Sequence, residues 1–515
     1  MLVYGDHVRA VDVARTLAAP AGDPTADFIA LSELAQGLLD AEFEARGCDD
    51  LTPLHAAAVA DLRARAARLA AAWDGRPAPP PPAAALTGLA LPQTVKAKTA
   101  EGHAFYAVYP EAYLEAARAV GWAAPPLVLG LRSIGLGLAA MVAEGAGAAE
   151  VASLRPVGPP FRRELRIAPG LRARLAAHAG PFAVVDEGPG LSGSSFGAVL
   201  DLLEGLGVAR ERIVVFPSHA GDPGPEASAA HRARWAGLRK AAVDFPALSA
   251  RRPLATRFED VTGPVHAVED LSGGAWRAGR PLPAFPRQER LKFRLRTASG
   301  DWLVRFAGLG AAGEAKLARA RALHTAGWGP EAAALRWGFL LLRWVDGAPA
   351  RPRPDELAGY LGFRASLEGG AGASLDELAE MVRVNAGELG LDVRAQIPAV
   401  TPRPVQVDAR LHAWEWLRTA GGRLLKTDAL DHACAHDLVG CQDIAWDVAG
   451  AAVELGLSEP EVRALAQAAG ADMRLVAFHR LAYPAFQAGL WTFAGETAEV
   501  ARYRAALEDA SRVAA

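Results

Sequence analysis

Apolar positions in the first 74 residues recur with the 3.6-residue spacing of amphipathic helices. This spacing is clear in VARTLA, in ALSELAQGLLDAEFEARG and in LHAAAVADLRARAARLAAAW. The next stretch, GRPAPPPPAAA, runs from Gly75 to Ala85, and its prolines favour an extended polyproline conformation instead of a helix. The pattern therefore predicts a helical region over residues 1–74, followed by a linker over residues 75–85.

Between residues 86 and 270, short apolar runs alternate with helical patterns. FYAVYP, PLVLGL, EVASL, FAVVDE and RIVVFPSH have the length of strands, whereas LGLAAMVAEG and GAVLDLLEGLG have helical spacing. Strands that alternate with helices are typical of a parallel sheet covered on both faces. We therefore predict an α/β domain with a parallel sheet over residues 86–270.

The pattern changes near residue 285. RLKFRLRTASGDWLVRFAG predicts two strands joined by a Ser-Gly turn. FLLLRWVDG predicts another strand, LHAWEWLRTAGGRLLKTDA predicts a hairpin, and helical spacing dominates the remainder from residue 312 onward. These elements predict a further domain of mixed α and β structure over residues 285–515.

The composition narrows the class of protein. A chain of 515 residues is too long for a single core, and a net charge of -3 does not indicate a nucleic-acid-binding protein. The sequence lacks the run of about 18 apolar residues that spans a membrane, and it lacks a signal-peptide pattern. Cys48, Cys434 and Cys441 are too few for a disulfide framework. We therefore expect a multidomain cytoplasmic protein.

Two acids, Asp186 and Glu187, stand between a predicted strand and a loop of glycine and serine. In an open parallel sheet, ligands bind beyond the carboxyl ends of the strands. The loop leads into a helix, whose first amides are free donors that suit a phosphate. Carboxylates beside a phosphate suit sugar hydroxyls or a bound cation, so the motif predicts a ribose 5-phosphate as ligand. The loop residues are Ser192, Gly193, Ser194 and Ser195.

The stretch FAVVDEGPGLSGSSFGAVLDLLEGLG resembles the phosphoribosyl pyrophosphate (PRPP) binding motif of the type I phosphoribosyltransferase family. The resemblance extends over residues 86–270, where PLVLGLRSIGLGLAAMVAEG is similar to the family's strand, pyrophosphate loop and helix. It implies that Asp186 and Glu187 hold the ribose hydroxyls, that the serine loop binds the 5-phosphate, and that Mg²⁺ bridges pyrophosphate and ribose. The implied pyrophosphate loop consists of Arg132, Ser133, Ile134 and Gly135.

The segment between these two motifs, ASLRPVGPPFRRELRIAPG, is similar to a flexible catalytic hood. The resemblance implies that Arg155, Arg162 and Arg163 reach the pyrophosphate. The chain departs from the family in one respect, because the spacer from the acids to Gly193 is one residue longer than the usual pattern.

Other features of this half leave alternatives open. Lys96 and Lys98 either contact a ligand or are solvated charges, and His219 either lies in a pocket for the acceptor or is a loop histidine. Residues 1–74 either cover the site or form a homodimer interface. The sequence does not identify the acceptor.

The order of elements after residue 285 resembles the aminoglycoside-phosphotransferase-like branch of the protein kinase fold, which implies a two-lobed α+β domain. In that fold a basic residue and a helix acid pair over ATP phosphates, a loop acid orients the substrate hydroxyl, and an acid after a hairpin binds Mg²⁺. The matching positions are Arg305, Glu314, Asp408 and Asp428, with Asp443 or Asp447 as the acid of the following helix.

This second resemblance has clear departures. Arg305 stands where lysine is usual, and the two side chains differ in shape and hydration. A glycine-rich loop is not evident, HGD or HRD does not precede the loop, and Ala413 stands where the metal-binding Asn is expected.

A polar cluster lies in KTDALDHACAHDLVGCQDIAWD. It fits a transition-metal site, a hydrogen-bonded polar loop, or a hard-metal site at Asp428 that serves ATP. The spacing is not that of a zinc finger. The cluster consists of Asp428, Asp431, His432, Cys434, His436, Asp437 and Cys441.

The sequence thus supports three hypotheses of function. The first is a PRPP-dependent phosphoribosyltransferase that displaces pyrophosphate and is fused to a kinase-like domain that phosphorylates acceptor or product. The second is a nucleotide- or PRPP-sensing regulator with a non-catalytic kinase-like half. The third makes the kinase-like half the working enzyme and the first half a recognition module.

Overall fold

The computed structural model describes residues 1–5, 8–18, 22–80, 84–159, 161–286, 288–435 and 437–514. The chain forms two compact units. The α/β unit consists of Val8–Leu254 and Gly308–Ala311, and the α+β unit consists of Met1–His7, Ala255–Ala307 and Ala312–Ala515.

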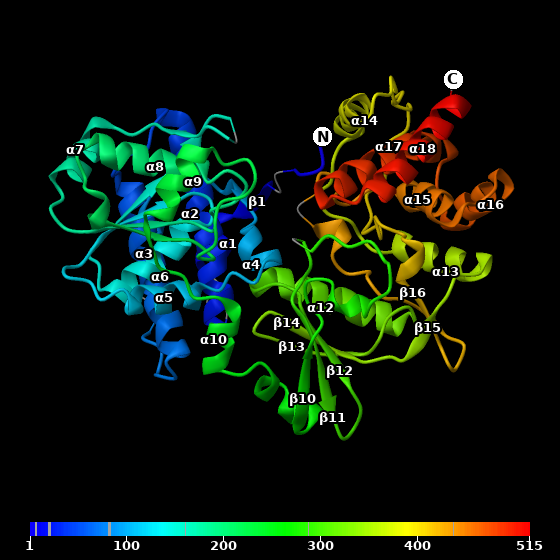
Figure 1. The fold of residues 1–515 in the computed structure, drawn as a ribbon, viewed down its shortest axis with the longest axis horizontal. Helices are drawn as coiled ribbons and strands as arrows, with labels where there is room; N and C mark the ends of the chain where they lie inside the picture. Colours follow the sequence, from blue (N-terminus) through cyan, green and yellow to red (C-terminus); the bar gives the residue numbers. More distant parts are fainter. Residues whose placement is uncertain are drawn as a thin grey trace. The chain divides into compact units, whose positions relative to one another are not determined.

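The α/β unit is built on a parallel sheet with the strand order β4-β3-β7-β8-β9. The strands are β3 (Leu127–Leu131), β4 (Glu150–Leu154), β7 (Phe182–Val185), β8 (Ile213–Phe216) and β9 (Arg239–Lys240). β3, β7 and β8 are buried along their whole length, as expected for strands of a parallel sheet covered by helices (Figure 1). The four strands predicted from PLVLGL, EVASL, FAVVDE and RIVVFPSH are therefore confirmed.

The strand predicted from FYAVYP is wrong. The chain instead forms the short helix α4 (Glu101–Phe105) and a turn in which the N–H groups of Tyr106 and Val108 both donate to the Gly102 carbonyl. Pro110 then starts α5 (Pro110–Ala119), because proline suits the first turn of a helix. Phe105 and Tyr109 are buried, so the apolar run marks core positions of a turn and not a strand.

Two long helices account for most of the predicted N-terminal helical region. α2 (Pro24–Arg46) starts at Asp23, whose side chain accepts a hydrogen bond from the Thr25 N–H, and α3 (Pro53–Trp73) follows. The prediction of helix throughout is wrong at residues 8–12, which form β1 (Val8–Asp12) and pair with β2 (Thr94–Lys98). The buried side chain of Val11 lies opposite Val95 in this ladder, which explains the strand.

The predicted boundary at residues 75–85 does not separate the two units. Both α2 and α3 pack on α6 (Gly135–Ala146), which in turn covers the parallel sheet, so the helical region belongs to the α/β unit. The contact with α2 is close, because a Cβ at Gly137 would lie 2.4 Å from Ser32 Oγ. Residues 81–83 of the predicted linker lie outside the described residues.

Shorter elements complete the α/β unit around α8 (Ser194–Gly205), the helix predicted from GAVLDLLEGLG. A two-strand hairpin lies between β4 and β7 in the sequence. The remaining elements are α1 (Val13–Ala18), β5 (Pro156–Val157), β6 (Glu164–Leu165), α7 (Pro169–Ala177), α9 (Ala229–Ala236) and α10 (Phe245–Arg251).

The α+β unit contains an antiparallel sheet with the order β10-β11-β12-β14-β13. The hairpin of β11 (Lys292–Thr297) and β12 (Trp302–Phe306) and the strand β14 (Phe339–Arg343) confirm the predictions for these segments. The unit starts earlier than the predicted residue 285, because β10 (Val265–Asp270) pairs with β11. α11 (Glu259–Thr262), α12 (Gly310–Thr325) and β13 (Ala332–Arg336) complete this part.

A small sheet and a set of helices form the rest of this unit (Figure 1). The predicted hairpin is confirmed as β16 (Trp416–Thr419) and β17 (Leu424–Lys426), and β15 (Gly347–Pro349) pairs with β16. The core includes the fully buried side chains of Trp446, Tyr483 and Phe486. The helices are α13 (Pro354–Ala365), α14 (Leu375–Glu388), α15 (Ala445–Leu455), α16 (Glu459–Ala469), α17 (Met473–Ala494) and α18 (Thr497–Ala514).

The first residues of the chain pack in the α+β unit. Val3 is buried in the core of this unit, and its carbonyl accepts a hydrogen bond of 2.7 Å from the Leu438 N–H. The Leu2 N–H donates to Asn385 Oδ1 over 2.6 Å. The first residues of the chain therefore belong to the α+β unit, and the α/β unit begins after them, at Val8.

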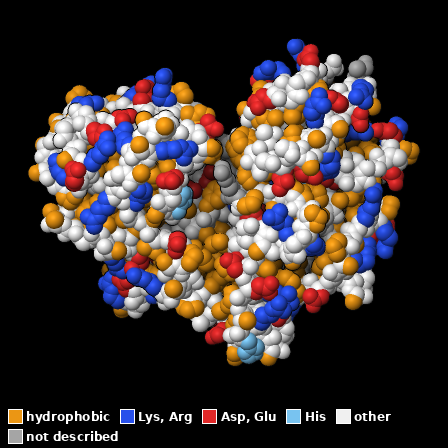
Figure 2. Space-filling model, viewed as in Figure 1, with side chains coloured by type: hydrophobic (Ala, Val, Ile, Leu, Met, Phe, Trp, Pro, Cys, Tyr) orange, Lys and Arg blue, Asp and Glu red, His pale blue; other side chains and the backbone are white. Residues whose placement is uncertain are grey.

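The surface and the helices give further information on the class of protein. On the face drawn in Figure 2, Lys and Arg side chains are interspersed with Asp and Glu side chains, in line with the small net charge. Within the described ranges, every helix is either too short or too polar to cross a bilayer.

The contact between α5 and α6 yields a test of the fold. A Cβ at Gly145 would lie 2.5 Å from the Leu114 carbonyl oxygen and 2.9 Å from Ala117 Cβ. We expect Gly145→Ala to lower the free energy of unfolding by about 1–3 kcal/mol, because the two helices must separate. Gly205→Ala is the matched control, since no atom lies within 4 Å of its Cβ and alanine favours a helix. Equal urea midpoints for the two variants would contradict this packing.

Candidate functional site

The acid pair lies at a topological switch point of the parallel sheet. The neighbouring strands β3 and β7 lie side by side, and the chain leaves β3 toward β4 on the opposite side. Ligands of open α/β sheets bind beyond the carboxyl ends of strands at such a point. A Cβ at Gly135 would lie 2.6 Å from the Val185 carbonyl oxygen and 3.3 Å from Asp186 Cα. The loop after β3 therefore adjoins the acid pair after β7.

The two carboxylates are half-buried and lack a cation. Burial raises the pKa of Asp186 to about 7. Burial, and next the repulsion by Glu101 and Asp186, raises the pKa of Glu187 to about 8, although the Gly102 N–H acts in the opposite direction. The Tyr113 hydroxyl fixes the strand end by donating to the Asp186 carbonyl over 2.9 Å. Because neither carboxylate forms an ion pair with a described side chain, the site favours a bound cation or hydroxyl donors.

The serine loop leads into the first turn of α8. Gly193 precedes the helix with φ of 67°, a conformation that favours glycine. A Cβ there would lie 2.4 Å from His231 Nε2, so the imidazole of α9 packs directly on the loop. The Ser194 N–H donates to Ser192 Oγ over 3.2 Å, and Ser192, Ser194 and Ser195 are half-buried. The loop thus presents hydroxyl and amide donors beside the acid pair.

Arg132 differs from its predicted place in a pyrophosphate loop. Its side chain is only 2% exposed and is held by Asp40 (2.7 Å), by Asp49 and by Ser153 Oγ (3.0 Å). A guanidinium with three buried partners is not free to bind phosphate, so we correct its role to a structural one that joins α2 and the α2–α3 loop to the sheet. Ser133 is half-buried, and the Arg132–Ser133 peptide bond is cis.

The predicted hood forms a small hairpin of β5 and β6. Arg155 pairs with Asp40 over 3.0 Å, and Arg163 donates to the Gly158 carbonyl over 2.5 Å. Arg162 is exposed. Pro160, within this segment, lies outside the described residues. The pyrophosphate contacts of Arg162 and Arg163 stay predictions.

The three weaker candidates of this unit have ordinary environments. Lys96 is exposed on β2, and Lys98 is half-buried at its end. His219 is exposed after β8, and its Nδ1 accepts a hydrogen bond of 3.2 Å from the Gly221 N–H. Burial lowers the pKa of His219. This environment favours the loop-histidine alternative.

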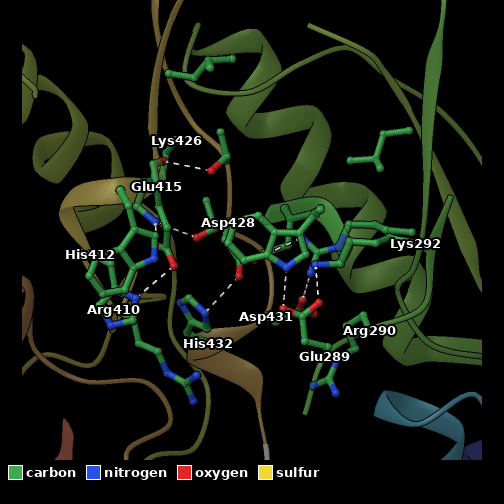
Figure 3. Close-up of a pocket in the computed structure, with 18 of the residues that line it drawn as sticks. Glu289, Arg290, Lys292, Arg410, His412, Glu415, Lys426, Asp428, Asp431 and His432 are labelled. Carbon is green, nitrogen blue, oxygen red and sulfur yellow. Dashed lines mark hydrogen bonds and ion pairs between the residues drawn. The ribbon is translucent and has the colours of Figure 1, made fainter. Parts of the chain in front are cut away.

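The α+β unit contains a cavity of about 440 Å³ (Figure 3). Glu289, Arg290 and Lys292, at the end of the β10–β11 loop and the start of β11, lie on one side of it. Residues of β16, β17 and the loops that flank them form another wall, which includes Asp428. The sequence pattern did not indicate that the β10–β11 loop lines a cavity, because this loop lacks periodic spacing.

The predicted pair of Arg305 and Glu314 is wrong. Arg305 donates to Asp428 Oδ1 over 3.2 Å and pairs with Asp431, whereas Glu314 is exposed on α12. Lys316, one half-turn further along the same helix, reaches Asp431 over 2.7 Å. Burial acts to raise the pKa of Asp431, but Lys316 and Arg305 hold it well below its usual range. The helix therefore contributes a cation to this cluster, not an acid.

Asp408 also lies elsewhere than predicted. Its side chain is fully buried, accepts a hydrogen bond from the Tyr360 hydroxyl, lies 3.4 Å from Lys426 Nζ, and does not line the cavity. A carboxylate in this position cannot orient a substrate hydroxyl, so its predicted role is corrected to a structural one. The N–H groups of Asp408 and Ala409 donate to the Asp447 carboxylate over 2.7 and 2.9 Å. Asp447, rather than Asp443, is therefore the acid that holds this loop.

Two residues missed in the sequence line the cavity instead. Arg410 and Glu415 are five residues apart, the separation of the catalytic Asp and the metal-binding Asn in the HRDxxxxN motif of kinases. Ala413 stands five residues after Asp408, so a count from Asp408 does not lead to a residue that could replace the metal-binding Asn. Counting from Arg410 gives an arginine and a glutamate where that motif has an acid and an amide.

The polar cluster after β17 is a network of hydrogen bonds and ion pairs. His432 Nε2 lies 3.6 Å from Asp428 Oδ2, and its Nδ1 lies 3.1 Å from the Asp408 carbonyl. Burial opposes the charge, yet Asp428 and Asp408 raise the pKa of His432 to about 9. In the described part of the cluster, from which His436 is left out, no three His, Cys, Asp or Glu side chains are placed to hold a metal. The polar-loop interpretation is therefore favoured.

Comparison with known proteins gives limited similarity. No protein-family model matches the sequence, and no curated protein matches it. The choline kinase LicA from Streptococcus pneumoniae is similar over 51% of this chain and 99% of its own, with 14% identity and a TM-score of 0.34. A choline/ethanolamine kinase family protein from Mesorhizobium loti is similar over 51% and 93%, with 17% identity and a TM-score of 0.31. Aminoglycoside 2'-phosphotransferase-IIIa is similar over 52% and 99%, with 14% identity and a TM-score of 0.31.

The raised pKa of Glu187 predicts a stabilising substitution. The folded state keeps a proton that the unfolded chain releases, so stability falls as the pH rises through the ordinary value toward about 8. Glu187→Gln has no carboxyl group at this position to ionise, so the variant avoids this fall in stability. We expect its gain in unfolding free energy to be about 1–3 kcal/mol larger at pH 8.5 than at pH 5.

The exposed Glu211 provides the control for this measurement. Glu211→Gln should change the unfolding free energy equally at both pH values. Urea titrations of the wild type and both variants at each pH supply the comparison. An increase in the unfolding free energy of Glu187→Gln that is the same at both pH values would show that burial does not raise the pKa of the Glu187 carboxyl group.

Proposed function

We propose that the chain is a phosphoribosyltransferase that uses PRPP, with its site at the switch point between β3 and β7. One observation carries the proposal: a half-buried acid pair that forms no ion pair with a described side chain adjoins a serine loop at the start of α8. The hydroxyls of a ribose 5-phosphate suit the acid pair, and its phosphate suits the serine loop. The sheet order and the motif order support the same location.

The residues present suit the parts of such a substrate. Asp186 and Glu187 accept hydrogen bonds from the ribose hydroxyls, and the hydroxyl and N–H groups of residues 192–195 donate to the 5-phosphate. Two carboxylates of raised pKa also suit Mg²⁺, which when bound neutralises charge on the pyrophosphate. The bond from the ribose anomeric carbon to pyrophosphate breaks, the leaving group takes the electron pair, and a bond to the acceptor forms. In this proposal Arg162, which is exposed on the hood, stabilises that leaving group.

A second candidate function is a regulator that senses PRPP or a nucleotide without turnover. The observation that favours it lies in the α+β unit. Arg410 lines the cavity there and, by its separation of five residues from Glu415, matches the position of the catalytic Asp in the kinase motif. ATP-dependent transfer by this unit, the third hypothesis, depends on Asp428, whose carboxylate is 40% exposed. These alternatives differ from the first in whether PRPP is consumed.

Binding of PRPP tests the location of the site. We expect the double variant Asp186→Asn/Glu187→Gln to bind PRPP roughly 30-fold or more weakly than the wild type, because about 2 kcal/mol is lost with the charged acceptors. Calorimetric titration in MgCl₂ measures the change, and Glu211→Gln is the control that should bind normally. Failure of the wild type to bind PRPP at millimolar concentration would exclude the proposal.

Turnover separates the enzyme from the sensor. Release of pyrophosphate is measured with PRPP, Mg²⁺ and a panel of metabolite acceptors. For the double variant Arg162→Ala/Arg163→Ala we expect a fall of about 10²-fold or more, since the hood acts on the leaving group. PRPP affinity should change less than about threefold, because the ribose and 5-phosphate contacts remain. Tight binding of PRPP by the wild type without any pyrophosphate release would favour the sensor.

A further inference from the structure

The cavity of the α+β unit does not suit the divalent metal that a kinase-like site implies. Kinases hold Mg²⁺ on an acid after the hairpin and on an amide in the preceding loop. Here the acid is Asp428, and Glu415 lies at the position of the amide. Asp428 is held by Arg305 over 3.2 Å and by His432 over 3.6 Å. Although burial acts to raise it, Arg305 and His432 hold the pKa of Asp428 well below its usual range.

Glu415 is occupied in the same way. Its Oε2 lies 2.6 Å from Lys426 Nζ, and its Oε1 lies 3.0 Å from His412 Nδ1. The Lys426 side chain is fully buried and also donates to the Asp428 carbonyl over 2.8 Å. A metal ion would have to displace these cations and leave them buried and unpaired, which is costly. The cations therefore stand where a metal would bind.

The charge at the position of the catalytic acid is also reversed. Arg410 lines the cavity and pairs with Asp437 over 2.8 Å. An arginine cannot accept the proton of a substrate hydroxyl, because it stays protonated in proteins. The only acid that the sequence predicted for this role, Asp408, is turned away into the core. The position of the catalytic acid is thus held by a group that cannot activate a nucleophile for phosphoryl transfer.

Three further polar groups at the cavity have no hydrogen-bond partner among the described residues. The indole nitrogens of Trp416 and Trp491 and the Nε2 of His412 are buried and have no hydrogen-bond partner within the described residues. All three residues are less than 5% exposed and line the cavity. A buried donor without a partner is costly, so the two indole N–H groups favour an acceptor supplied by a ligand. Indole N–H groups donate only, which requires acceptor atoms such as the oxygens of an anion.

Cations and aromatic rings define the ligand further. Arg290 and Lys292 lie on the far side of the cavity from Asp428 (Figure 3). Lys292 Nζ pairs with Glu289 Oε2 over 3.0 Å and lies 5.5 Å from the centre of the Trp276 ring. Trp276 and Trp344 also line the cavity, with Lys292 over the ring of Trp276 and Arg294 Cζ 3.9 Å from the centre of the Trp344 ring. Aromatic rings of this kind suit a flat ring in a ligand. A volume of about 440 Å³ lies in the range of small-molecule sites. These features suit a phosphate attached to an aromatic group.

We propose that this cavity binds an aromatic organic phosphate of the nucleotide class by direct contacts with protein cations and indole N–H groups, without a divalent metal and without transfer of phosphate. The inference concerns the α+β unit and is independent of PRPP chemistry in the α/β unit. It replaces a metal-bridged site by one in which Arg305, Lys426 and His432 are the fixed positive charges.

The test is a calorimetric titration with AMP and with ATP, each in excess EDTA and in excess MgCl₂. It uses the Asp186→Asn/Glu187→Gln protein, so that the ribose 5-phosphate site of the α/β unit does not contribute. We expect one site per chain and dissociation constants in EDTA and MgCl₂ that agree within about threefold. Binding of neither nucleotide, or binding only with Mg²⁺, would overturn the proposal.

Two further substitutions in that protein separate direct binding from metal-mediated binding. Lys292→Ala should weaken binding by about tenfold, as expected for one charged hydrogen bond. Arg296→Ala is the matched control, because Arg296 lies on the same strand and is ion-paired like Lys292, but does not line the cavity. Asp428→Asn should leave affinity unchanged or increase it, since it removes a negative charge near an anion.

A measurement of phosphate release from ATP completes the test. Incubation of the same protein with ATP and MgCl₂ should give no release of the terminal phosphate above the rate without protein. Release that is lost in Asp428→Asn, or binding that is lost in Asp428→Asn while Lys292→Ala binds normally, would establish a metal-bridged catalytic site and contradict the proposal.

Discussion

The ion pairs of Arg305 with Asp428 and Asp431 determine what the cavity of the α+β unit can bind. Buried carboxylates need a cation, and here side chains of the protein supply it from β12, from α12 and from the loop after β17. The acids of the cavity are thus paired with lysine and arginine side chains that also line it, and two buried indole N–H groups there have no hydrogen-bond partner among the described residues. The α/β unit has the opposite arrangement. Asp186 and Glu187 are half-buried without a cation, so that site favours hydroxyls or a metal.

Both arrangements depend on long-range positioning by buried polar groups. Asp447 binds the N–H groups of Asp408 and Ala409, which fixes the loop that carries Arg410 to the cavity wall. In the α/β unit, Arg132 joins Asp40 and Asp49 to the end of β3. Removing either group would leave partners buried and unsatisfied. The functional side chains are therefore held by groups that do not themselves contact a ligand.

Local pattern was sufficient to predict much of the fold. The runs FAVVDE and PLVLGL are buried strands, and the acid pair and serine loop follow directly from their position after β7. The strand β1 was missed because five residues are too few to show alternation beside helical neighbours. FYAVYP was misassigned because its apolar residues fill the core from a turn. For β1 the deciding partner is β2, where Val95 lies opposite Val11 although the two are far apart in the sequence.

The same reason limited prediction of the sites. Asp40 and Asp49 are 92 and 83 residues from Arg132, and Asp431 is 126 residues from Arg305. No spacing rule indicates such pairs, so the sequence pattern predicts Arg132 as a ligand residue and Glu314 as a partner of Arg305. Arg410 and Glu415 were the exception. Their separation of five was visible in the sequence, but arginine does not suggest the position of a catalytic acid.

The central claim is that the PRPP site lies in the α/β unit and not in the α+β unit. Hydrogen–deuterium exchange of the wild type with and without PRPP and MgCl₂ tests it most directly. The account predicts that PRPP slows exchange of amides in residues 133–136 and 192–197, the two loops at the ends of β3 and β7. Slower exchange in residues 289–306 and 410–432, with none in those loops, would contradict it.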